Sequence, residues 1–281
     1  MKNRILALIF ALLLILTVFC GCKKVENNPA GAVNVPNSEK PVDAKVQVIA
    51  DSINIWKFDK TAYEGTQALY DYCVTDLDQN GQFELITVVN VPKVGVVNAY
   101  DTVVKYYELN KDFSALLTLE RVADSESQPQ PDLCTIVENV NAKDTDTCAC
   151  FKDEETGRYY YVFADKSVDF NEDGTKSEHY SKVAISIFEG KAYEETLATY
   201  SILREKGKDA LEVYTDGEGN EITLEEFEGI EDTRFEGLKK MKVTFGWQGC
   251  SESNFDKELN PASNIFIKKL SDSFYDFKIN E

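Results

Sequence analysis

The chain has 281 residues, with 49 Asp and Glu against 30 Lys and Arg, so its formal net charge at pH 7 is −19. Such an acidic surface repels phosphate backbones and anionic lipid headgroups, which argues against nucleic acid as a partner and against polybasic membrane binding. The single histidine, His179, lies in the charged segment KSEHYSK, so neither a catalytic triad nor a zinc site built from histidines is indicated.

The first residues have the features of a secretory signal. Basic Lys2 and Arg4 precede an uncharged apolar run from Ile5 to Phe19. This run is shorter than the roughly 20 residues of a membrane-spanning helix and matches the apolar region of a signal peptide.

The segment VFCGCKK that follows resembles a bacterial lipobox, in which a signal peptidase cuts before a cysteine that is then acylated. The resemblance implies that residues 1–21 are a lipoprotein signal peptide and that Cys22 is the lipidated residue, with Cys20 as the alternative. Phe19 and Cys20 depart from the usual residues of this motif, and an ordinary secretory signal or an uncleaved anchor is the other interpretation. A lipoprotein would be held on the cell membrane by its acyl chain and would face outside the cell.

Residues 22–42 are rich in Asn, Pro, Gly, Ser and Lys and show no apolar period. This composition is typical of a disordered linker. We therefore expect a tether between the lipid and a single β-rich globular domain at residues 43–281.

The domain is expected to begin with a helix capped by Asp43, because apolar residues recur after it at helical spacing. These residues are Val46, Ile49, Ala50, Ile53 and Trp56. Paired apolar runs separated by turn residues then predict β-hairpins at 69–91, 101–122, 149–164 and 182–202, and the alternating run 240–247 predicts a further strand.

Two helices are expected in the C-terminal half. Thr223 and Glu226 have the spacing of a capping box, and four apolar residues recur at helical spacing near the C-terminus. The four are Phe266, Leu270, Phe274 and Phe277. The sequence thus predicts an α+β fold of mostly antiparallel β-hairpins, with an N-terminal helix and two helices in the C-terminal half.

The loop TDLDQNGQFEL holds a candidate calcium site. Asp76, Asp78 and Asn80 alternate, Gly81 follows, and the backbone carbonyl of Gln82 and the side chain of Glu84 can complete the set. Ca²⁺ takes six to eight oxygen ligands, and alternate side chains around a tight turn converge on one point. The loop is not an EF-hand, because Thr87 stands where that motif has its bidentate Glu.

This pattern resembles the D-x-D-x-[DN]-G-x-x-[DE]-L calcium loop of integrin-type (FG-GAP) propeller blades. The resemblance covers about ten residues and implies Ca²⁺ bound between two strands, but it does not transfer the propeller fold. The alternative is a plain acidic hairpin turn, since Asn-Gly between apolar strands is itself a strong turn signal. Two further acidic segments, 169–177 and 216–227, match the pattern less well and are interpreted as hairpin tips.

Five cysteines follow Cys22, namely Cys73, Cys134, Cys148, Cys150 and Cys250. An odd number leaves at least one thiol outside any intramolecular disulfide. The spacing of CAC at 148–150 is too tight for a metal knuckle, so we interpret these residues as small apolar side chains with room for one disulfide.

The segments IWKFD, VTDLDQNGQFELI, TGRYYYVF and DGEGNEITLEEF, in this order behind a lipobox, resemble uncharacterised lipoproteins of clostridia-type Gram-positive bacteria. The resemblance covers most of residues 46–250 and implies a Gram-positive cell surface, but it brings no activity. The function we expect is a non-enzymatic binding or structural module at the cell surface with one calcium-stabilised hairpin loop. The alternatives are a carboxylate-dependent hydrolase of polysaccharide and an accessory subunit of a transport system.

Overall fold

The computed structural model describes residues 41–57, 69–92, 100–123, 149–170, 175–204, 207–250 and 254–280. The predicted signal peptide, Cys22 and nearly all of the predicted tether lie outside these residues. All described residues belong to one compact unit. Among them, no helix is both long enough and apolar enough to span a membrane.

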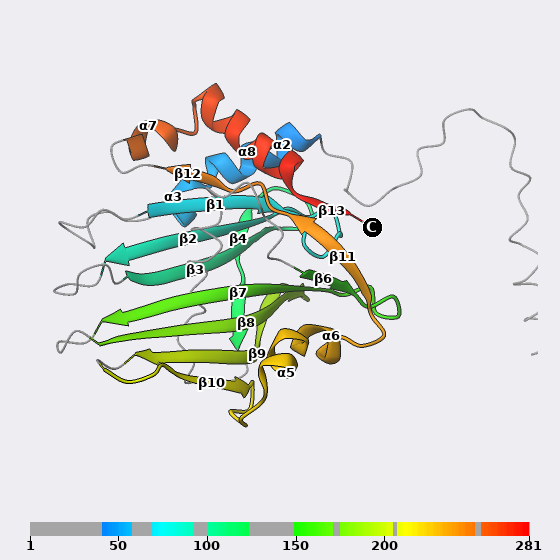
Figure 1. The fold of residues 1–281 in the computed structure, drawn as a ribbon. Helices are drawn as coiled ribbons and strands as arrows, with labels where there is room; N and C mark the ends of the chain where they lie inside the picture. The colour runs from blue at the N-terminus through cyan, green and yellow to red at the C-terminus, as the bar shows by residue number, and fades with distance from the viewer. Residues whose placement is uncertain are drawn as a thin grey trace, which may run out of the picture. The chain divides into compact units, whose positions relative to one another are not determined.

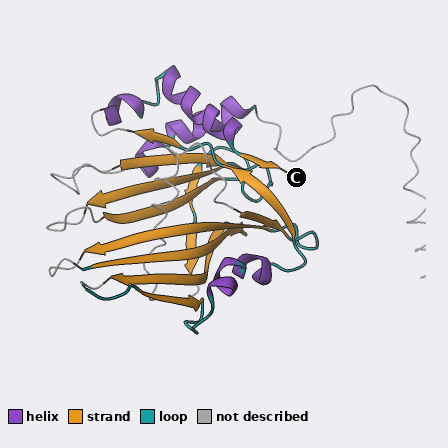
Figure 2. Ribbon diagram, in the orientation of Figure 1, coloured by secondary structure: helices purple, strands orange, loops and turns teal. Residues whose placement is uncertain are grey.

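Two sheets form the centre of this unit (Figures 1 and 2). The first sheet has five strands, all antiparallel to their neighbours, in the order β12-β1-β2-β3-β4. Its strands are β1 (Leu69–Thr75), β2 (Glu84–Pro92), β3 (Tyr100–Leu109), β4 (Leu116–Thr118) and β12 (Gln248–Cys250).

The second sheet has eight strands, and its main path runs β10-β9-β8-β7-β6-β11-β13. Its strands are β5 (Glu120–Ala123), β6 (Ala149–Lys152), β7 (Tyr159–Phe170), β8 (Lys176–Phe188), β9 (Lys191–Arg204), β10 (Leu211–Asp216), β11 (Lys239–Thr244) and β13 (Lys278–Asn280). Strand β5 lies off this path and pairs with β9 in parallel, whereas the other pairs are antiparallel.

Helices cover the outer face of each sheet (Figure 1). The helices are α2 (Val42–Asp51), α3 (Ile53–Trp56), α5 (Leu224–Glu228), α6 (Ile230–Arg234), α7 (Phe255–Glu258) and α8 (Asn264–Asp276). Residues of α2, α3, α7 and α8 share one buried cluster with the first sheet, in which Trp56 and Phe266 pack on Tyr72. A smaller cluster joins the second sheet to the α5–α6 segment through Phe235 and Phe151.

The remaining cluster lies between the two sheets. The first sheet contributes Ile86, Val88 and Tyr106, and the second contributes Tyr161 and Phe163 among others. Because side chains alternate along a strand, the neighbouring residues Leu85 and Tyr107 point instead into the cluster under the helices. The order of layers is therefore helices, first sheet, second sheet, short helices.

The α+β fold of mostly antiparallel strands is confirmed. Hairpins form at β1–β2, β6–β7 and β8–β9, and both side-chain and backbone bonds of the Thr223–Glu226 capping box are present. The predicted stripe of the first helix is buried, but Asp43 does not cap it. The helix begins at Val42 after Pro41, and it breaks into α2 and α3 at Ser52, whose hydroxyl donates to the Val48 carbonyl.

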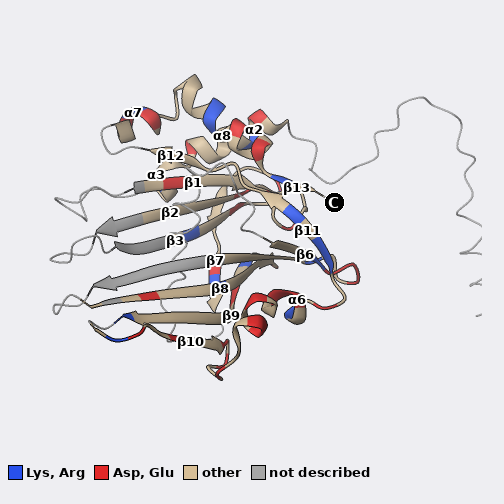
Figure 3. Cartoon of the chain, viewed as in Figure 1, with Lys and Arg blue, Asp and Glu red and all other residues tan. Residues whose placement is uncertain are grey.

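In the segment 101–122 the predicted hairpin forms between β3 and β4, around the predicted turn that begins at Asn110, but its second arm does not continue to residue 122 in the same sheet. After β3 and β4 the chain passes through Leu119, which is buried between the sheets, and β5 then joins the second sheet. Figure 3 shows both acidic and basic positions along the helices that pack on the first sheet.

Candidate metal site

The candidate site is the connection between β1 and β2. The two strands pair in register from Leu69 opposite Asn90 to Thr75 opposite Glu84, so the connection spans residues 76–83. This is longer than the two-residue turn that Asn80 and Gly81 by themselves would favour. Its backbone takes left-handed conformations at Gln79 (φ 56°) and Gly81 (φ 81°), and glycine adopts the latter without steric cost.

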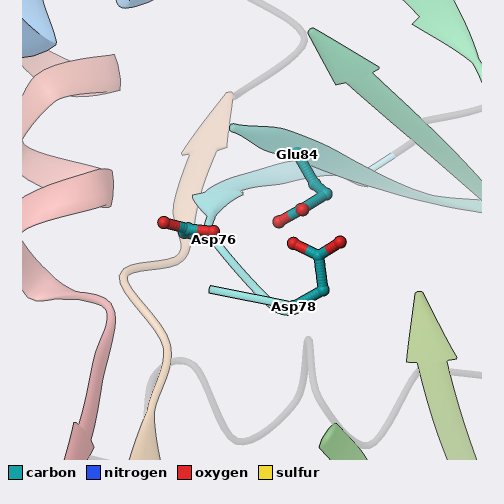
Figure 4. Close-up of side chains that lie close together, drawn as sticks. All are labelled: Asp76, Asp78 and Glu84. Carbon is teal, nitrogen blue, oxygen red and sulfur yellow. The ribbon is translucent and has the colours of Figure 1, made fainter. Parts of the chain in front are cut away.

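Three of the predicted ligands converge in this loop. Asp76, Asp78 and Glu84 each present a carboxylate oxygen, and these oxygens all lie within 4.8 Å of one another. Figure 4 shows the carboxylates of Asp78 and Glu84 pointing toward each other, with that of Asp76 beside them. Among the described residues, this is the one group of three or more acidic, His or Cys side chains with such spacing.

Glu84 is the buried member of the group, with no exposed surface. Its Oε2 accepts hydrogen bonds from the Leu77 amide at 2.7 Å and the Thr75 hydroxyl at 3.1 Å. Its Oε1 is buried and has no hydrogen-bond partner among the described residues. Burial raises the pKa of Glu84 well above its usual value, and the charges of Asp78 and Asp76 raise it further. A buried carboxylate oxygen of this kind requires either a proton or a cation.

The two aspartates are held by the backbone of the loop. Asp76 accepts from the Gly81 amide at 3.2 Å, and Asp78 accepts from the Asn80 amide at 3.2 Å. Burial raises the pKa of Asp76 to about 6, and the nearby Asp78 carboxylate adds to the rise. Burial likewise raises the pKa of Asp78. All three acids therefore resist ionisation in the absence of a cation.

Asn80 has a different orientation from the one predicted, whereas the backbone carbonyl of Gln82 as a ligand stays a prediction. Asn80 turns its nitrogen toward the acids, with Nδ2 donating to Asp78 Oδ2 at 2.7 Å, while its Oδ1 accepts from the Gln82 amide at 2.5 Å. The Gln82 side chain donates to the Leu109 carbonyl at 2.7 Å and so fixes the loop to the end of β3. Asn80 can offer an oxygen to an ion only after its amide rotates.

Lys45 of α2 is a residue of the site that the loop motif could not reveal. Its side chain is buried, and Nζ donates to the Gly81 carbonyl at 2.7 Å. The ammonium group lies over the rings of Phe83 and Phe113, at 4.6 and 4.4 Å from the ring centroids. Burial lowers the pKa of Lys45, and Asp76 partly offsets this. The sequence indicated only that Lys45 lies on the buried side of the helix, because it is next to Val46 and one helical turn before Ile49.

Glu108 of β3 is a second such residue. It lies directly opposite Glu84 in the β2–β3 register. Burial raises its pKa, and the charges of Asp78 and Asp76 contribute. The sequence separates Glu108 from the motif by a whole strand, so only knowledge of the strand register could have identified it.

The loop is attached to every layer around it. Lys45 reaches it from the helices above the first sheet, and the Tyr161 hydroxyl of β7 donates to the Leu77 carbonyl at 2.6 Å from the second sheet. Just before the loop, the amide of Val74 donates to the Ser273 hydroxyl of α8 at 2.9 Å. An ion bound here would therefore strengthen a junction between the layers.

The other candidate residues are placed differently. His179 is exposed and its Nδ1 lies 2.9 Å from the Ser201 hydroxyl. Cys73, Cys150 and Cys250 are buried free thiols, as expected for small apolar side chains, whereas Cys134 and Cys148 lie outside the described residues. The acidic segment 169–177 also lies partly outside the described residues, at positions 171–174.

Comparison with protein-family models, with curated proteins and with solved structures finds no match for this chain.

Proposed function

We propose that this protein is a lipid-anchored, non-enzymatic module of the outer cell surface whose loop 76–84 binds Ca²⁺ in a structural role. The observation that carries the calcium part is the convergence of Asp76, Asp78 and Glu84 around a buried carboxylate oxygen without a hydrogen-bond partner. A divalent cation would satisfy that oxygen and offset the mutual repulsion of the three acids.

The chemistry of the group favours Ca²⁺ over other common metals. The converging side chains offer only carboxylate oxygens, whereas zinc and the later transition metals prefer nitrogen and sulfur ligands. Ca²⁺ accepts irregular oxygen cages, while Mg²⁺ requires near-octahedral geometry and keeps several waters. A site of this composition should bind with a dissociation constant of about 0.1–1 mM, the range of extracellular modules.

Two features support a structural role over hydrolysis by the same carboxylates. Glycosidases separate their two carboxyl groups by roughly 5–9.5 Å around a substrate, but these oxygens lie within 4.8 Å of one another. Glu84 has no exposed surface, so a polysaccharide cannot reach it. Its hydrogen bonds to Thr75 and Leu77 hold it as part of the loop.

The tyrosines of the second sheet also favour packing over a sugar-binding platform. Tyr180, Tyr200 and Tyr214 are cross-strand neighbours, and the rings of Tyr200 and Tyr214 stack with centroids 4.3 Å apart and an interplanar angle of 2°. Phe227 of α5 packs against both of these rings. Ring faces that cover one another are not free to stack on a sugar.

The calcium proposal is tested by thermal unfolding of the detergent-solubilised full chain in EDTA and in about 2 mM Ca²⁺. A site with a dissociation constant of about 0.1–0.2 mM should add roughly 1.4–1.8 kcal/mol, which is a few degrees in the midpoint. Asp78→Ala should remove the shift, and Asp216→Ala, at an exposed turn, should keep it. An equal shift in both variants would refute the assignment.

The anchor is tested separately by labelling growing cells with radioactive palmitate. Cys22→Ala should abolish incorporation and release the protein from the membrane fraction, whereas Cys20→Ala should leave both unchanged. Incorporation that persists in Cys22→Ala would assign the lipid to another residue.

A further inference from the structure

We propose that Glu108 belongs to the metal site, where it adds a fourth negative charge and holds the amide of Asn80 for the ion. This inference rests on the proposed calcium site and identifies a residue that lies outside the loop motif.

The strand register brings Glu108 to the site. Residues directly opposite one another in an antiparallel pair have Cβ atoms about 4.5–5.5 Å apart, and Glu108 is opposite Glu84. By strand alternation both side chains point to the same side of the first sheet as Ile86 and Tyr106, toward the second sheet. The two carboxylates therefore lie at the edge of the core between the sheets.

Like charges directly opposite one another in a sheet are destabilising, and here four acids share one region. Two lysines act on the group, Lys45 on Asp76 and Lys111 on Glu108. Once ionised, four carboxylates carry more negative charge than these two cations offset, which suits a site whose counter-ion is a divalent metal.

Asn80 connects Glu108 to the ligands. Its Nδ2 lies 2.7 Å from Asp78 Oδ2 and 3.5 Å from Glu108 Oε1, the latter at the outer limit of a hydrogen bond. When Asp78 gives its oxygen to an ion, Glu108 remains as an acceptor for Nδ2. Rotation of the amide toward Glu108 then directs Oδ1 of Asn80 at the ion. Groups that orient a metal ligand in this way commonly change metal affinity by about 10–100-fold.

The test is a Ca²⁺ titration by calorimetry of the full chain in detergent, with metal-free stability measured in EDTA as a second readout. Glu108→Gln keeps an acceptor but removes the charge, Glu108→Ala removes both, and Glu120→Gln on β5 is the exposed control. We expect Glu108→Ala to weaken Ca²⁺ binding about tenfold and Glu108→Gln by less. Metal-free stability should not fall in Glu108→Gln, because a repelling charge is removed. The control should match the wild type.

A double-mutant cycle with Asn80→Ala separates positioning from charge alone. If Glu108 holds Asn80, Glu108→Ala should weaken binding less in the Asn80→Ala background than in the wild type. Failure of the wild type to bind Ca²⁺ would refute the proposed function itself. If the wild type binds and the Glu108 variants bind equally well, or if they lose affinity only in proportion to lost metal-free stability, the inference about Glu108 is wrong while the calcium site stands.

Discussion

Two acidic turns of this protein have similar composition and opposite environments. At the tip after β10, the Asp216 carboxylate accepts from the side-chain amide of Asn220 at 2.9 Å and from the backbone amides of Asn220 and Glu218 at 2.8 and 2.9 Å, and these bonds lower its pKa. In the loop after β1, burial raises the pKa of Asp76, Asp78 and Glu84. The turn at Asp216 is exposed, whereas Glu84 begins a strand that passes between the helices and the second sheet.

This difference shows what separates an ordinary acidic turn from a candidate metal site. At Asp216 the side chain of Asn220 and the backbone satisfy the charge locally, so no ion is needed. At residues 76–84 the strand position of Glu84 brings a carboxylate into the core, and one of its oxygens stays without a hydrogen bond. Whether an acidic turn can bind a metal therefore depends less on its number of acids than on whether one of them lies on a buried strand.

The largest expected effect is on the pH dependence of the metal-free protein. Acids whose folded pKa is raised are protonated more readily in the folded state, so stability falls as pH rises from about 4 through their folded pKa. For Asp76, with a pKa of about 6, the loss between pH 4 and pH 7 is about 2 kcal/mol after allowance for its partial exposure. Urea unfolding in EDTA at pH 5 and pH 7 should give the higher stability at pH 5.

Calcium should offset this trend, because the ion binds the ionised acids. With about 2 mM Ca²⁺ the gain from the ion should grow between pH 5 and pH 7. Asp216 affects stability at a lower pH than these acids do. Its ionised carboxylate stabilises the fold, and this stabilisation is lost only as pH falls through its lowered pKa. Metal-free stability that is higher at pH 7 than at pH 5 would contradict the assignment of these acids.

Glu84→Gln should have the next largest effect. Burial already favours the neutral acid of Glu84 in the metal-free protein, so a neutral glutamine should leave the stability in EDTA at pH 7 equal to or above that of the wild type. The calcium gain of roughly 1.4–1.8 kcal/mol should disappear. Thermal melts in EDTA and Ca²⁺ measure both quantities, and a calcium shift that survives in Glu84→Gln would argue that the ion binds elsewhere.

Lys45→Met should have a smaller effect, lowering the metal-free stability but strengthening calcium binding. The Gly81 carbonyl loses its hydrogen-bond donor, which destabilises the fold, while the removal of a buried ammonium group offsets part of this loss. The net loss of stability in EDTA should be about 1 kcal/mol. Removing a cation near Asp76 should tighten calcium binding, so the calcium shift should increase. A variant that lost stability and calcium affinity together would indicate that Lys45 builds the loop rather than competing with the ion.

Asp216→Ala should have the smallest effect, and it tests whether the turn at Asp216 differs from the loop 76–84 in binding no ion. The turn loses the hydrogen bonds from Glu218 and Asn220, so stability should fall slightly and by the same amount in EDTA and in Ca²⁺. The control is the calcium shift itself, which should match that of the wild type. A changed shift would mean that this turn also binds the ion.

Much of the fold could be predicted from local patterns. Period-two alternation and turn residues predicted the hairpins, and the Thr223–Glu226 spacing predicted a capping box that forms as expected. The crossing of the chain at Leu119 from one sheet to the other could not be predicted, because both strands on either side have the same strand signal. The split at Ser52 also depends on local hydrogen bonding that spacing does not reveal.

The candidate site was predicted only as far as the motif extends. Asp76, Asp78 and Glu84 converge as their spacing indicated, but Asn80 turns its nitrogen toward them. Lys45 and Glu108 reach the loop through helix packing and strand register, which are long-range properties that a ten-residue motif does not encode.

The most direct measurement is a calorimetric Ca²⁺ titration of the detergent-solubilised full chain, compared with Asp78→Ala. We expect one site with a dissociation constant of about 0.1–1 mM in the wild type and no measurable binding in the variant. Absence of binding in the wild type, or equal binding in the variant, would contradict this expectation and leave residues 76–83 as an acidic connection between two strands.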